Sequence, residues 1–337
     1  MIETISSCFP ETRVGNEELA GLGDGWTAEK IFQKTGIRTR AVVAEGECAS
    51  DLAFGAAEKV LTASERNEID FLLLCTQSPD YPLPTTACLL QHRLGLRTDC
   101  GALDFNLGCS GYVYGLAVAQ GLIEAAVARS ILLLNADTYS RFLNAGDIAT
   151  RSIFGDAGTA TLIRADSKQR VHSFVLGTDG SGAENLIHRK GGGRSCLRDG
   201  QALGGAPGDE WLRMNGPEIF NFTLKRVPEL VSKVLAKAKL DRDDVDYFVF
   251  HQANRFMLEH LRRKLGIPED RFAIELESCG NTVSASIPIA LEAALAAGRI
   301  QSGMKVMLVG FGVGLSWAHH PRQPSRALSR HWVAWRK

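Results

Sequence analysis

The chain has 337 residues, of which 45% are hydrophobic and 23% are charged, a balance typical of a globular protein. Its 38 Lys and Arg residues equal its 38 Asp and Glu residues, so overall charge gives no reason to expect a nucleic-acid or membrane partner. Residues 1–6 have neither a basic region nor an apolar run, and no apolar stretch reaches the ~18 residues that a membrane helix needs, so we expect a cytoplasmic protein.

Apolar segments of strand length alternate with segments of helical period in the first half of the chain. The predicted elements are a strand at 69–75, a loop at 79–84, a helix at 85–94, a strand at 103–107, a helix at 110–126 and a strand at 130–135. The strands at 69–75 and 130–135 contain continuous apolar runs, Phe71–Cys75 and Ile131–Leu134, that do not alternate with polar residues. This pattern is typical of a largely parallel sheet whose two faces are both covered by helices.

The second half repeats the pattern at a spacing of about 170–180 residues, which predicts a duplicated α/β unit. Residues 246–251 correspond to 70–75, and each of these strands leads to a helix that ends in Leu-Gly. A strand predicted at 273–276 corresponds to the one at 103–107, and 304–309 corresponds to 131–135. Cys109 and Asn281 then occupy equivalent positions and are expected to face each other near a pseudo-twofold axis.

Cys109 lies in the segment Asn106-Leu-Gly-Cys-Ser-Gly-Tyr112, where a predicted strand turns into a helix. The free N–H groups of a helix N-terminus favour an anion and so favour a thiolate, while the flanking glycines allow a sharp turn. The eight cysteines include no CxxC pair, so a zinc or redox motif is not expected, and Cys75 is predicted to be a buried apolar side chain. From this motif alone, a catalytic and a structural Cys109 are equally supported.

Two further polar residues follow predicted strands in the second half. His251, in Phe-His-Gln-Ala-Asn, is expected at the carboxyl edge of the sheet, where ligand sites form in α/β folds. Asn281, in Gly-Asn-Thr-Val-Ser-Ala-Ser, lies at a turn into a helix, where Asn is also an ordinary helix cap. The turn Gly310–Gly314 can direct backbone N–H groups at an oxyanion.

Taken together, these segments resemble the Cys-His-Asn triad of the β-ketoacyl-acyl-carrier-protein synthase III family. The resemblance extends from Lys34-Thr-Gly-Ile-Arg-Thr-Arg40 through Phe154-Gly-Asp-Ala-Gly158 to Phe311–Trp317, with a 30-residue step from His251 to Asn281. It implies an α/β thiolase-like fold in which duplicated βαβαβαββ halves form α-β-α-β-α layers. The expected parts are an N-terminal half at 1–170, a connecting strand and Gly-rich region at 171–215, a C-terminal half at 216–320 and a basic tail at 321–337.

The resemblance also implies a reaction. Cys109 would accept an acyl group from a thioester, and His251 and Asn281 would stabilise the enolate that forms when a malonyl thioester loses carbon dioxide. The reaction requires a neutral His251 and no metal or organic cofactor. The implied partners are an acyl carrier protein, acyl-coenzyme A and a second copy of the chain in a homodimer.

The residue roles implied by the resemblance fall into three groups. They are an oxyanion site from the backbone of Cys109, Gly312, Val313 and Gly314, a substrate pocket that includes Leu83, Phe154 and Phe311, and carrier or coenzyme A contacts from Lys30, Lys34, Arg40, Arg151, Arg255, Arg262, Arg263 and Lys264. The basic residues after His251 are also typical of a solvated helix face.

Three departures from the family pattern indicate a specialised enzyme. Lys30 stands where typical members carry a Trp that stacks on the coenzyme A adenine, which favours carrier-bound donors. Leu83 stands where a large aromatic residue of the partner subunit closes the acyl pocket, which favours a longer or branched acyl group. The Gly-rich segment 191–208 lengthens the region before His251 and is expected to be a surface loop.

Three alternatives remain open on the sequence. The acyl-Cys109 could pass its acyl group to an alcohol or amine, with His251 as general base, in secondary metabolism or surface-sugar modification. The chain could be a non-catalytic partner of a true synthase, although all three triad residues are present. A Cys-His-Asn hydrolase is a more remote possibility.

Overall fold

The computed structural model describes residues 2–23, 25–165, 173–193, 197–198, 201–202, 208, 210–312 and 316–322. The predicted tail from 323 onward and much of the Gly-rich segment 191–208 lie outside these residues. None of the described helices combines the length and the apolar composition that a bilayer crossing requires.

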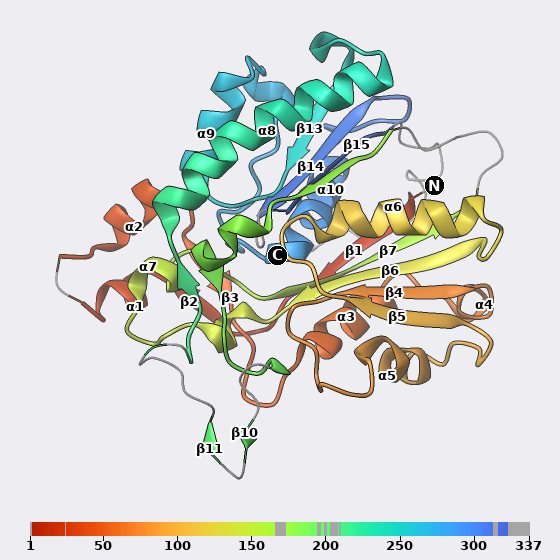
Figure 1. Ribbon diagram of the computed structural model, residues 1–337, viewed down its shortest axis with the longest axis horizontal. Coiled ribbons are helices and arrows are strands. Elements are labelled where there is room, and N and C mark those ends of the chain that lie inside the picture. The colour runs from red at the N-terminus through yellow and green to blue at the C-terminus, as the bar shows by residue number, and fades with distance from the viewer. Residues whose placement is uncertain are drawn as a thin grey trace.

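The N-terminal half is a five-stranded sheet with helices on both faces (Figure 1). Its elements are β1 Ile2–Cys8, α3 Ala49–Glu58, β4 Phe71–Cys75, α5 Thr86–Arg93, β5 Gly101–Phe105, α6 Gly111–Glu124, β6 Ser130–Asp137 and β7 Ala157–Arg164. The strand order is β1-β7-β6-β4-β5. Strand β4 is parallel to β5 and β6, and β7 is antiparallel to β1 and β6.

The C-terminal half has the same order of sheet strands, except that β5 has no counterpart. Its elements are β8 Val175–Thr178, α8 Gly216–Ala238, β13 Tyr247–Phe250, α9 Arg255–Lys264, α10 Ser286–Ala296, β14 Val306–Gly312 and β15 Ser316–Arg322. The order β8-β15-β14-β13 in this sheet matches β1-β7-β6-β4 in the first, which confirms the predicted duplication. Strand β8, expected in a connecting region, belongs to the second sheet and pairs with β15.

The predicted strand at 273–276 is wrong. Where β5 would have its counterpart, the structure has one parallel bridge between Phe248 and Phe272, and the N–H of Ala273 donates to the Phe248 carbonyl over 2.9 Å. Beyond this point the Gln252 side chain replaces a strand partner: its Nε2 donates to the Ala273 carbonyl and its Oε1 accepts from the N–H of Glu275. With their backbone groups satisfied in this way, these residues leave the sheet.

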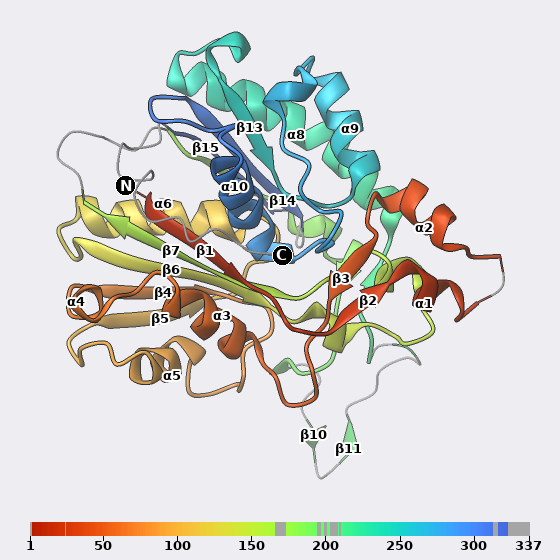
Figure 2. The ribbon, with the colours of Figure 1, turned by 180° about the vertical axis from the view of Figure 1, so that it is seen from behind.

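The two halves stack so that α6 and α10 lie between the sheets, while α3 and α5 cover one outer face and α8 and α9 the other (Figures 1 and 2). The layers arise because successive side chains of a strand point to opposite faces of its sheet. Leu73 and Leu133 point into the central core with α6, whereas Leu72 and Leu132 point into the core beneath α3 and α5. Both faces are therefore buried, at about 1.5–3 kcal/mol of stabilisation for each large side chain. This confirms the thiolase-like layered fold.

The remaining elements lie at the edges of this core. They are β2 Arg13–Gly15, paired with β3 Thr39–Ala41, α1 Asn16–Ala20, α2 Ala28–Thr35, α4 Ala63–Arg66, α7 Ile148–Arg151, β9 Leu186–Ile187, paired with β12 Arg213–Met214, β10 Leu197–Arg198, paired with β11 Gln201–Ala202, and the 3-10 turns η1 Tyr139–Phe142, η2 Gly180–Asn185, η4 Arg242–Asp244, η5 Glu269–Arg271 and η6 Val283–Ala285. Of these, η1 and η6 contribute side chains to the site described next.

Candidate active site

Cys109 lies in the turn between β5 and α6, where the sequence predicts it. The N–H of Gly111 closes the turn by donating to the Gly108 carbonyl over 2.7 Å. The Cys109 side chain is only 4% exposed and packs in a cluster with Tyr139, Leu143, Phe154, Leu186, Leu212 and Val283. Cys75 lies behind the same turn, and burial raises the pKa of its thiol well above the ordinary value. Cys75 is therefore the buried, protonated thiol that we predict.

The end of β14 packs directly against Cys109. A Cβ atom placed on Gly312 would lie 2.6 Å from the Cβ of Cys109 and 2.7 Å from its Sγ, and one on Gly310 would lie 2.7 Å from the Cα of Ser110. Only glycine fits at such distances. The structure thus brings Gly312 to the thiol, while Val313 and Gly314 lie outside the described residues.

His251 follows β13 and is held from two sides. Its backbone N–H donates to the Val309 carbonyl over 2.8 Å, and its Nδ1 lies 2.7 Å from the Oγ of Ser286. The imidazole is 2% exposed, and burial lowers its pKa to about 3, so the ring is neutral at physiological pH. Ser286 is a functional residue that the sequence analysis did not single out, although it lies in the same motif as Asn281.

The surroundings of Ser286 favour one tautomer of His251. The backbone N–H of Gln252 donates to the Ser286 Oγ over 3.4 Å, and among the described residues the Nδ1 of His251 is the acceptor within reach of the Ser286 hydroxyl hydrogen. The ring proton of a neutral His251 then resides on Nε2. The site therefore presents His251 as a hydrogen-bond donor.

Asn281 is fixed by the first half of the chain. Its N–H donates to the Ile153 carbonyl over 2.9 Å, and its carbonyl accepts from the N–H of Gly155 over 3.1 Å. Its Oδ1 accepts from the Val283 N–H over 3.0 Å, which leaves the N–H groups of Nδ2 as the donors that the side chain offers. Val283 has φ 52°, a left-handed conformation that costs a β-branched residue about 1–3 kcal/mol and is typical of functional sites.

Contacts through neighbouring residues bring the three predicted residues to one place. Phe311 packs edge-on against the His251 ring with centroids 5.5 Å apart, and the next residue, Gly312, touches Cys109. Phe154 packs in the Cys109 cluster and forms a backbone bridge to Asn281. These contacts place Cys109, His251 and Asn281 in one region of the structure.

Asp137 is a buried carboxyl group that the sequence analysis did not identify. It accepts from the N–H of Gln77 over 2.8 Å and from both the N–H and the hydroxyl of Ser284, over 3.1 and 2.5 Å. Burial raises its pKa to about 6. Because Ser284 lies between Asn281 and α10, Asp137 ties the end of β6 in the first half to the Asn281 segment in the second.

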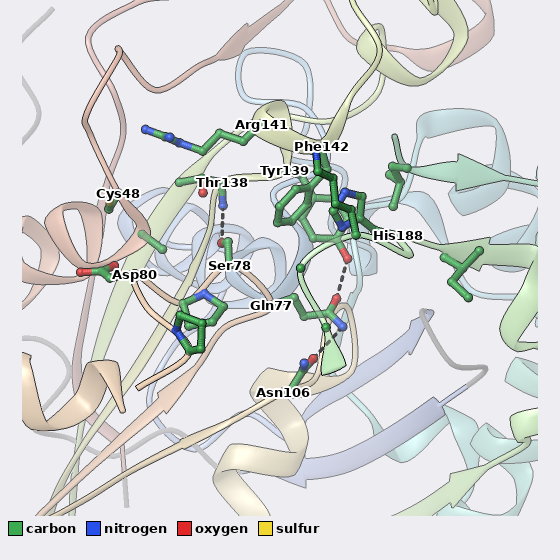
Figure 3. A pocket seen from close by; sticks show the side chains of 18 of the residues that line it. Cys48, Gln77, Ser78, Asp80, Asn106, Thr138, Tyr139, Arg141, Phe142 and His188 are labelled. Atoms are coloured by element: carbon green, nitrogen blue, oxygen red, sulfur yellow. Dashed lines mark hydrogen bonds between the residues drawn. The ribbon is translucent and has the colours of Figure 1, made fainter. Parts of the chain in front are cut away.

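A cavity of about 640 Å³ lies beside the cluster that contains Cys109 (Figure 3). Tyr139, Leu186 and Leu212 belong to that cluster and also line the cavity, so the cavity adjoins the cluster that holds the thiol. Phe154 is buried against Tyr139 with ring centroids 5.2 Å apart. Leu83 is 82% exposed and is not among the residues that line this cavity.

The prediction that Arg40 contacts a carrier or coenzyme A is wrong. Its side chain is 1% exposed, and the guanidinium donates to the Val14 carbonyl, the Asn16 Oδ1 and the Ser152 carbonyl over 3.2, 2.8 and 2.9 Å. Burial lowers the pKa of Arg40 to about 10, with a further contribution from the positive charge of Arg151. Arg40 holds three segments of the fold together and presents no face to solvent.

The other basic residues that we predict to contact a carrier or coenzyme A differ in how exposed and how free of other partners their side chains are. Arg262 is largely buried, paired with Glu259 and bonded to the Ile267 carbonyl, so its predicted docking role is also wrong. Lys264 donates to the Leu224 carbonyl, Lys30 to the Gly25 carbonyl and Arg151 to the Ala145 carbonyl. Arg263 is 70% exposed, Lys34 lies 4.8 Å from the Trp26 ring centre, and Arg255 pairs with Glu277 at 3.4 Å.

In the part of the chain that the structure describes, His, Cys, Asp and Glu side chains nowhere form a group of three or more that could hold a metal ion. The groups that this site offers are a buried thiol, neutral donors and backbone N–H groups. Such a set suits acyl transfer through a covalent thioester.

Comparison with known proteins gives one consistent result. Residues 103–180 match the family model described as 3-oxoacyl-(acyl-carrier-protein) synthase III, and residues 235–320 match its C-terminal model. The β-ketoacyl-acyl-carrier-protein synthase III of Xanthomonas euvesicatoria pv. vesicatoria is 36% identical over 313 residues, which cover 92% of this chain and 94% of that protein.

Solved structures agree. A crystal structure of a 3-oxoacyl-acyl-carrier-protein synthase III superimposes with a TM-score of 0.90 at 48% identity, covering 96% of this chain and 98% of the other. A 3-oxoacyl-acyl-carrier-protein synthase from Burkholderia xenovorans LB400 gives 0.89 at 37% identity, covering 97% and 94%. The similarity thus extends over nearly the whole chain.

Proposed function

This chain belongs to the β-ketoacyl-acyl-carrier-protein synthase III family of condensing enzymes, and from that premise we propose that Cys109 takes an acyl group from a thioester and condenses it with a malonyl thioester. The observation that supports this proposal is the placement of the buried Cys109 thiol, the neutral His251 imidazole and the Asn281 amide in one region of the structure.

The first half-reaction is acylation. The Cys109 thiolate attacks the thioester carbonyl carbon, and the carbonyl oxygen becomes an oxyanion that the backbone N–H groups of Cys109 and Gly312 can stabilise. The oxyanion then reforms its carbonyl and expels the pantetheine thiolate, which takes up a proton. The acyl group is left as a thioester on Cys109. The contact between Gly312 and the thiol supports this assignment, because a larger residue would occupy the space where the oxyanion forms.

The second half-reaction is condensation. We assign the malonyl thioester carbonyl to the Nε2–H of His251 and the Nδ2–H of Asn281. As the carboxylate leaves as carbon dioxide, its C–C bonding electrons form an enolate on that oxygen, so donors held in advance lower the barrier. The enolate carbon attacks the acyl carbonyl and the Cys109 thiolate departs, giving a β-ketoacyl thioester.

The pKa of His251 favours condensation over transfer to an alcohol or amine. A general base works best when its pKa lies near the operating pH, and burial lowers the pKa of His251 to about 3. Such an imidazole is a weak proton acceptor but a competent neutral donor. The relatives that this chain matches are named as synthases as well.

We propose an acyl carrier protein as the partner, docking where α2 meets α9. A Cβ on Gly36, which ends α2, would lie 2.3 Å from the Cβ of Arg255, so the two helices are in contact. Lys34 on α2 and Arg263 on α9 add exposed positive charge to this surface. Cationic residues on this surface suit an acidic carrier and speed its association.

We also propose a homodimer. Strand β5 ends the first sheet, and the exposed apolar side chains Tyr81, Leu83, Leu103 and Val118 lie on it or on elements near it. An open strand edge with exposed apolar residues is a typical pairing surface. The predicted cytoplasmic location and the prediction that no cofactor is needed remain predictions.

Intact-mass measurement tests the proposed reaction directly. The wild type and Cys109→Ala are incubated with acyl-coenzyme A and acyl-carrier donors, and then with malonyl-carrier. We expect an acyl adduct in the wild type alone, discharged by malonyl-carrier into a β-ketoacyl product. An adduct that malonyl-carrier leaves untouched would support the acyltransferase, and the absence of any adduct on Cys109 would support a non-catalytic partner.

A further inference from the structure

A chain of polar side chains crosses the wall of the cavity beside Cys109. The Tyr139 hydroxyl donates to the Gln77 Oε1 over 2.5 Å, and the Gln77 Nε2 donates to the Asn106 Oδ1 over 3.0 Å (Figure 3). Tyr139 is buried and packs in the same cluster as Cys109. One end of the polar chain therefore adjoins the acyl-carrying residue, and the rest lines the cavity.

The hydrogen bonds of this chain fix which groups remain for a ligand. Because the Gln77 oxygen accepts from Tyr139, its amide nitrogen faces Asn106 and keeps a second hydrogen. Because the Asn106 oxygen accepts from Gln77, both hydrogens of the Asn106 nitrogen are left to donate. The chain thus offers chiefly N–H donors, which match an oxygen acceptor and not a hydrocarbon.

The charged side chains on the cavity wall also favour a ligand with an oxygen acceptor. Lys190 and Arg141 are the cations that line it, the Arg141 guanidinium also donating to the Glu47 carbonyl over 2.6 Å, and Asp80 is the one acidic residue among the described lining residues. His188 stacks on Phe142, with ring centroids 4.5 Å apart, which holds it at the wall. A carbonyl or carboxylate oxygen is the acceptor that amide donors and cations together favour.

We propose that the cavity receives the distal end of the acyl group carried by Cys109, and that the Tyr139–Gln77–Asn106 chain selects acyl groups whose distal end bears a carbonyl or carboxylate oxygen. The inference rests on the proposed acylation of Cys109. A hydrocarbon end would remove water from these donors without replacing its hydrogen bonds, whereas an oxygen acceptor restores them. A site built to hydrogen-bond its substrate discriminates strongly against an analogue that lacks the polar group.

The test uses acyl-coenzyme A esters matched in size that end in an isopropyl, a methyl-ketone or a carboxylate group, each over a series of chain lengths. The rate of Cys109 acylation is measured by intact mass for the wild type, Gln77→Leu, Tyr139→Phe and the control Gln301→Leu. Gln301 is an exposed glutamine just before β14, so the control makes the same chemical change outside the cavity.

We expect the wild type and Gln301→Leu to prefer an oxygen-terminated ester by roughly 10- to 100-fold over its isopropyl match at the best chain length. Gln77→Leu should abolish or invert this preference, and Tyr139→Phe should weaken it. If the carboxylate ester acylates Cys109 faster than the ketone ester, Arg141 and Lys190 contribute to the selection. If the two esters acylate Cys109 at equal rates, the selection is assigned to the amide donors.

A wild type that prefers the isopropyl ester, or a Gln77→Leu variant with an unchanged preference, would overturn this inference and leave the condensing function intact. If no ester acylates Cys109, the proposed function fails together with the inference. Tyr139→Phe keeps the test decisive if Gln77→Leu does not fold, because it removes only the hydroxyl that orients Gln77.

Discussion

Acid should destabilise the wild type more than His251→Gln, because the folded protein keeps His251 neutral. Burial lowers the pKa of this imidazole to about 3, whereas an unperturbed histidine has a pKa of about 6.5. Between these two values the unfolded chain binds a proton that the folded chain does not, so stability is lost as the pH falls. Each pH unit costs about 1.4 kcal/mol, so the loss at pH 5 is about 2 kcal/mol.

Asp137 opposes this effect, so the prediction concerns the difference between two proteins. Burial raises the pKa of Asp137 to about 6, above its ordinary value of about 3.9, and the folded chain therefore binds an extra proton in that interval. Its contribution to stability is present at low pH and is lost as the pH rises through the interval, opposite in sign to that of His251. Between pH 6 and pH 5 these two contributions largely cancel in the wild type, so its own pH slope does not isolate His251.

Urea denaturation at pH 7 and pH 5 measures the quantity directly. The free energy of unfolding should fall by about 2 kcal/mol more in the wild type than in His251→Gln. His92→Gln, a substitution of an exposed histidine on α5, is the control and should follow the wild type. Equal losses in the wild type and His251→Gln would refute the inference that burial holds His251 neutral.

Gly312→Ala should lower the acylation rate of Cys109 on the order of 100-fold, because its Cβ would lie 2.7 Å from Sγ and reacting groups tolerate little displacement. Gly121→Ala on α6 meets no atom within 4 Å and should acylate normally, with intact mass against time as the measurement. Ser286→Ala should slow malonyl decarboxylation about 10- to 100-fold and leave acylation unchanged, because this hydroxyl fixes the donor tautomer of His251, which acts in decarboxylation. Equal losses in both steps would mean that Ser286 has a purely structural role. Leu83→Asp should shift the protein towards the monomer in sedimentation, because an 82% exposed side chain can lose its apolar character without cost to the isolated fold.

Much of the fold and the triad follows from local features of the sequence. His251 directly follows an apolar segment of strand length and Cys109 follows a predicted strand by two residues, and a side chain at the carboxyl end of a strand reaches the ligand edge of the sheet. The repeat of apolar segments indicates the duplication, because both halves bury strands in the same order between helices. These features depend on residues near one another in the chain.

Features that depend on distant partners could not be predicted. Arg40 belongs to a motif that resembles a surface contact, yet it is buried because three oxygen atoms from two distant segments, residues 14–16 and Ser152, receive its guanidinium. Asp137 and Ser284 are 147 residues apart, and neither residue signals the other. The link between Tyr139 and Gln77 likewise forms only when η1 folds back beside the end of β4.

The difference between the two halves explains how a duplicated fold produces one asymmetric site. In the first half β5 pairs with β4 along its whole length, so Cys109 enters α6 from a regular strand. In the second half the Gln252 side chain takes the backbone bonds of Ala273 and Glu275, and the released segment crosses to the first half. There Gly280, at φ 73° and too close to the Ile153 carbonyl for any Cβ, lets Asn281 pair with residues on either side of Phe154. The loss of one strand is therefore what allows Asn281 of the second half to pair with the first half next to Phe154, a residue of the Cys109 cluster.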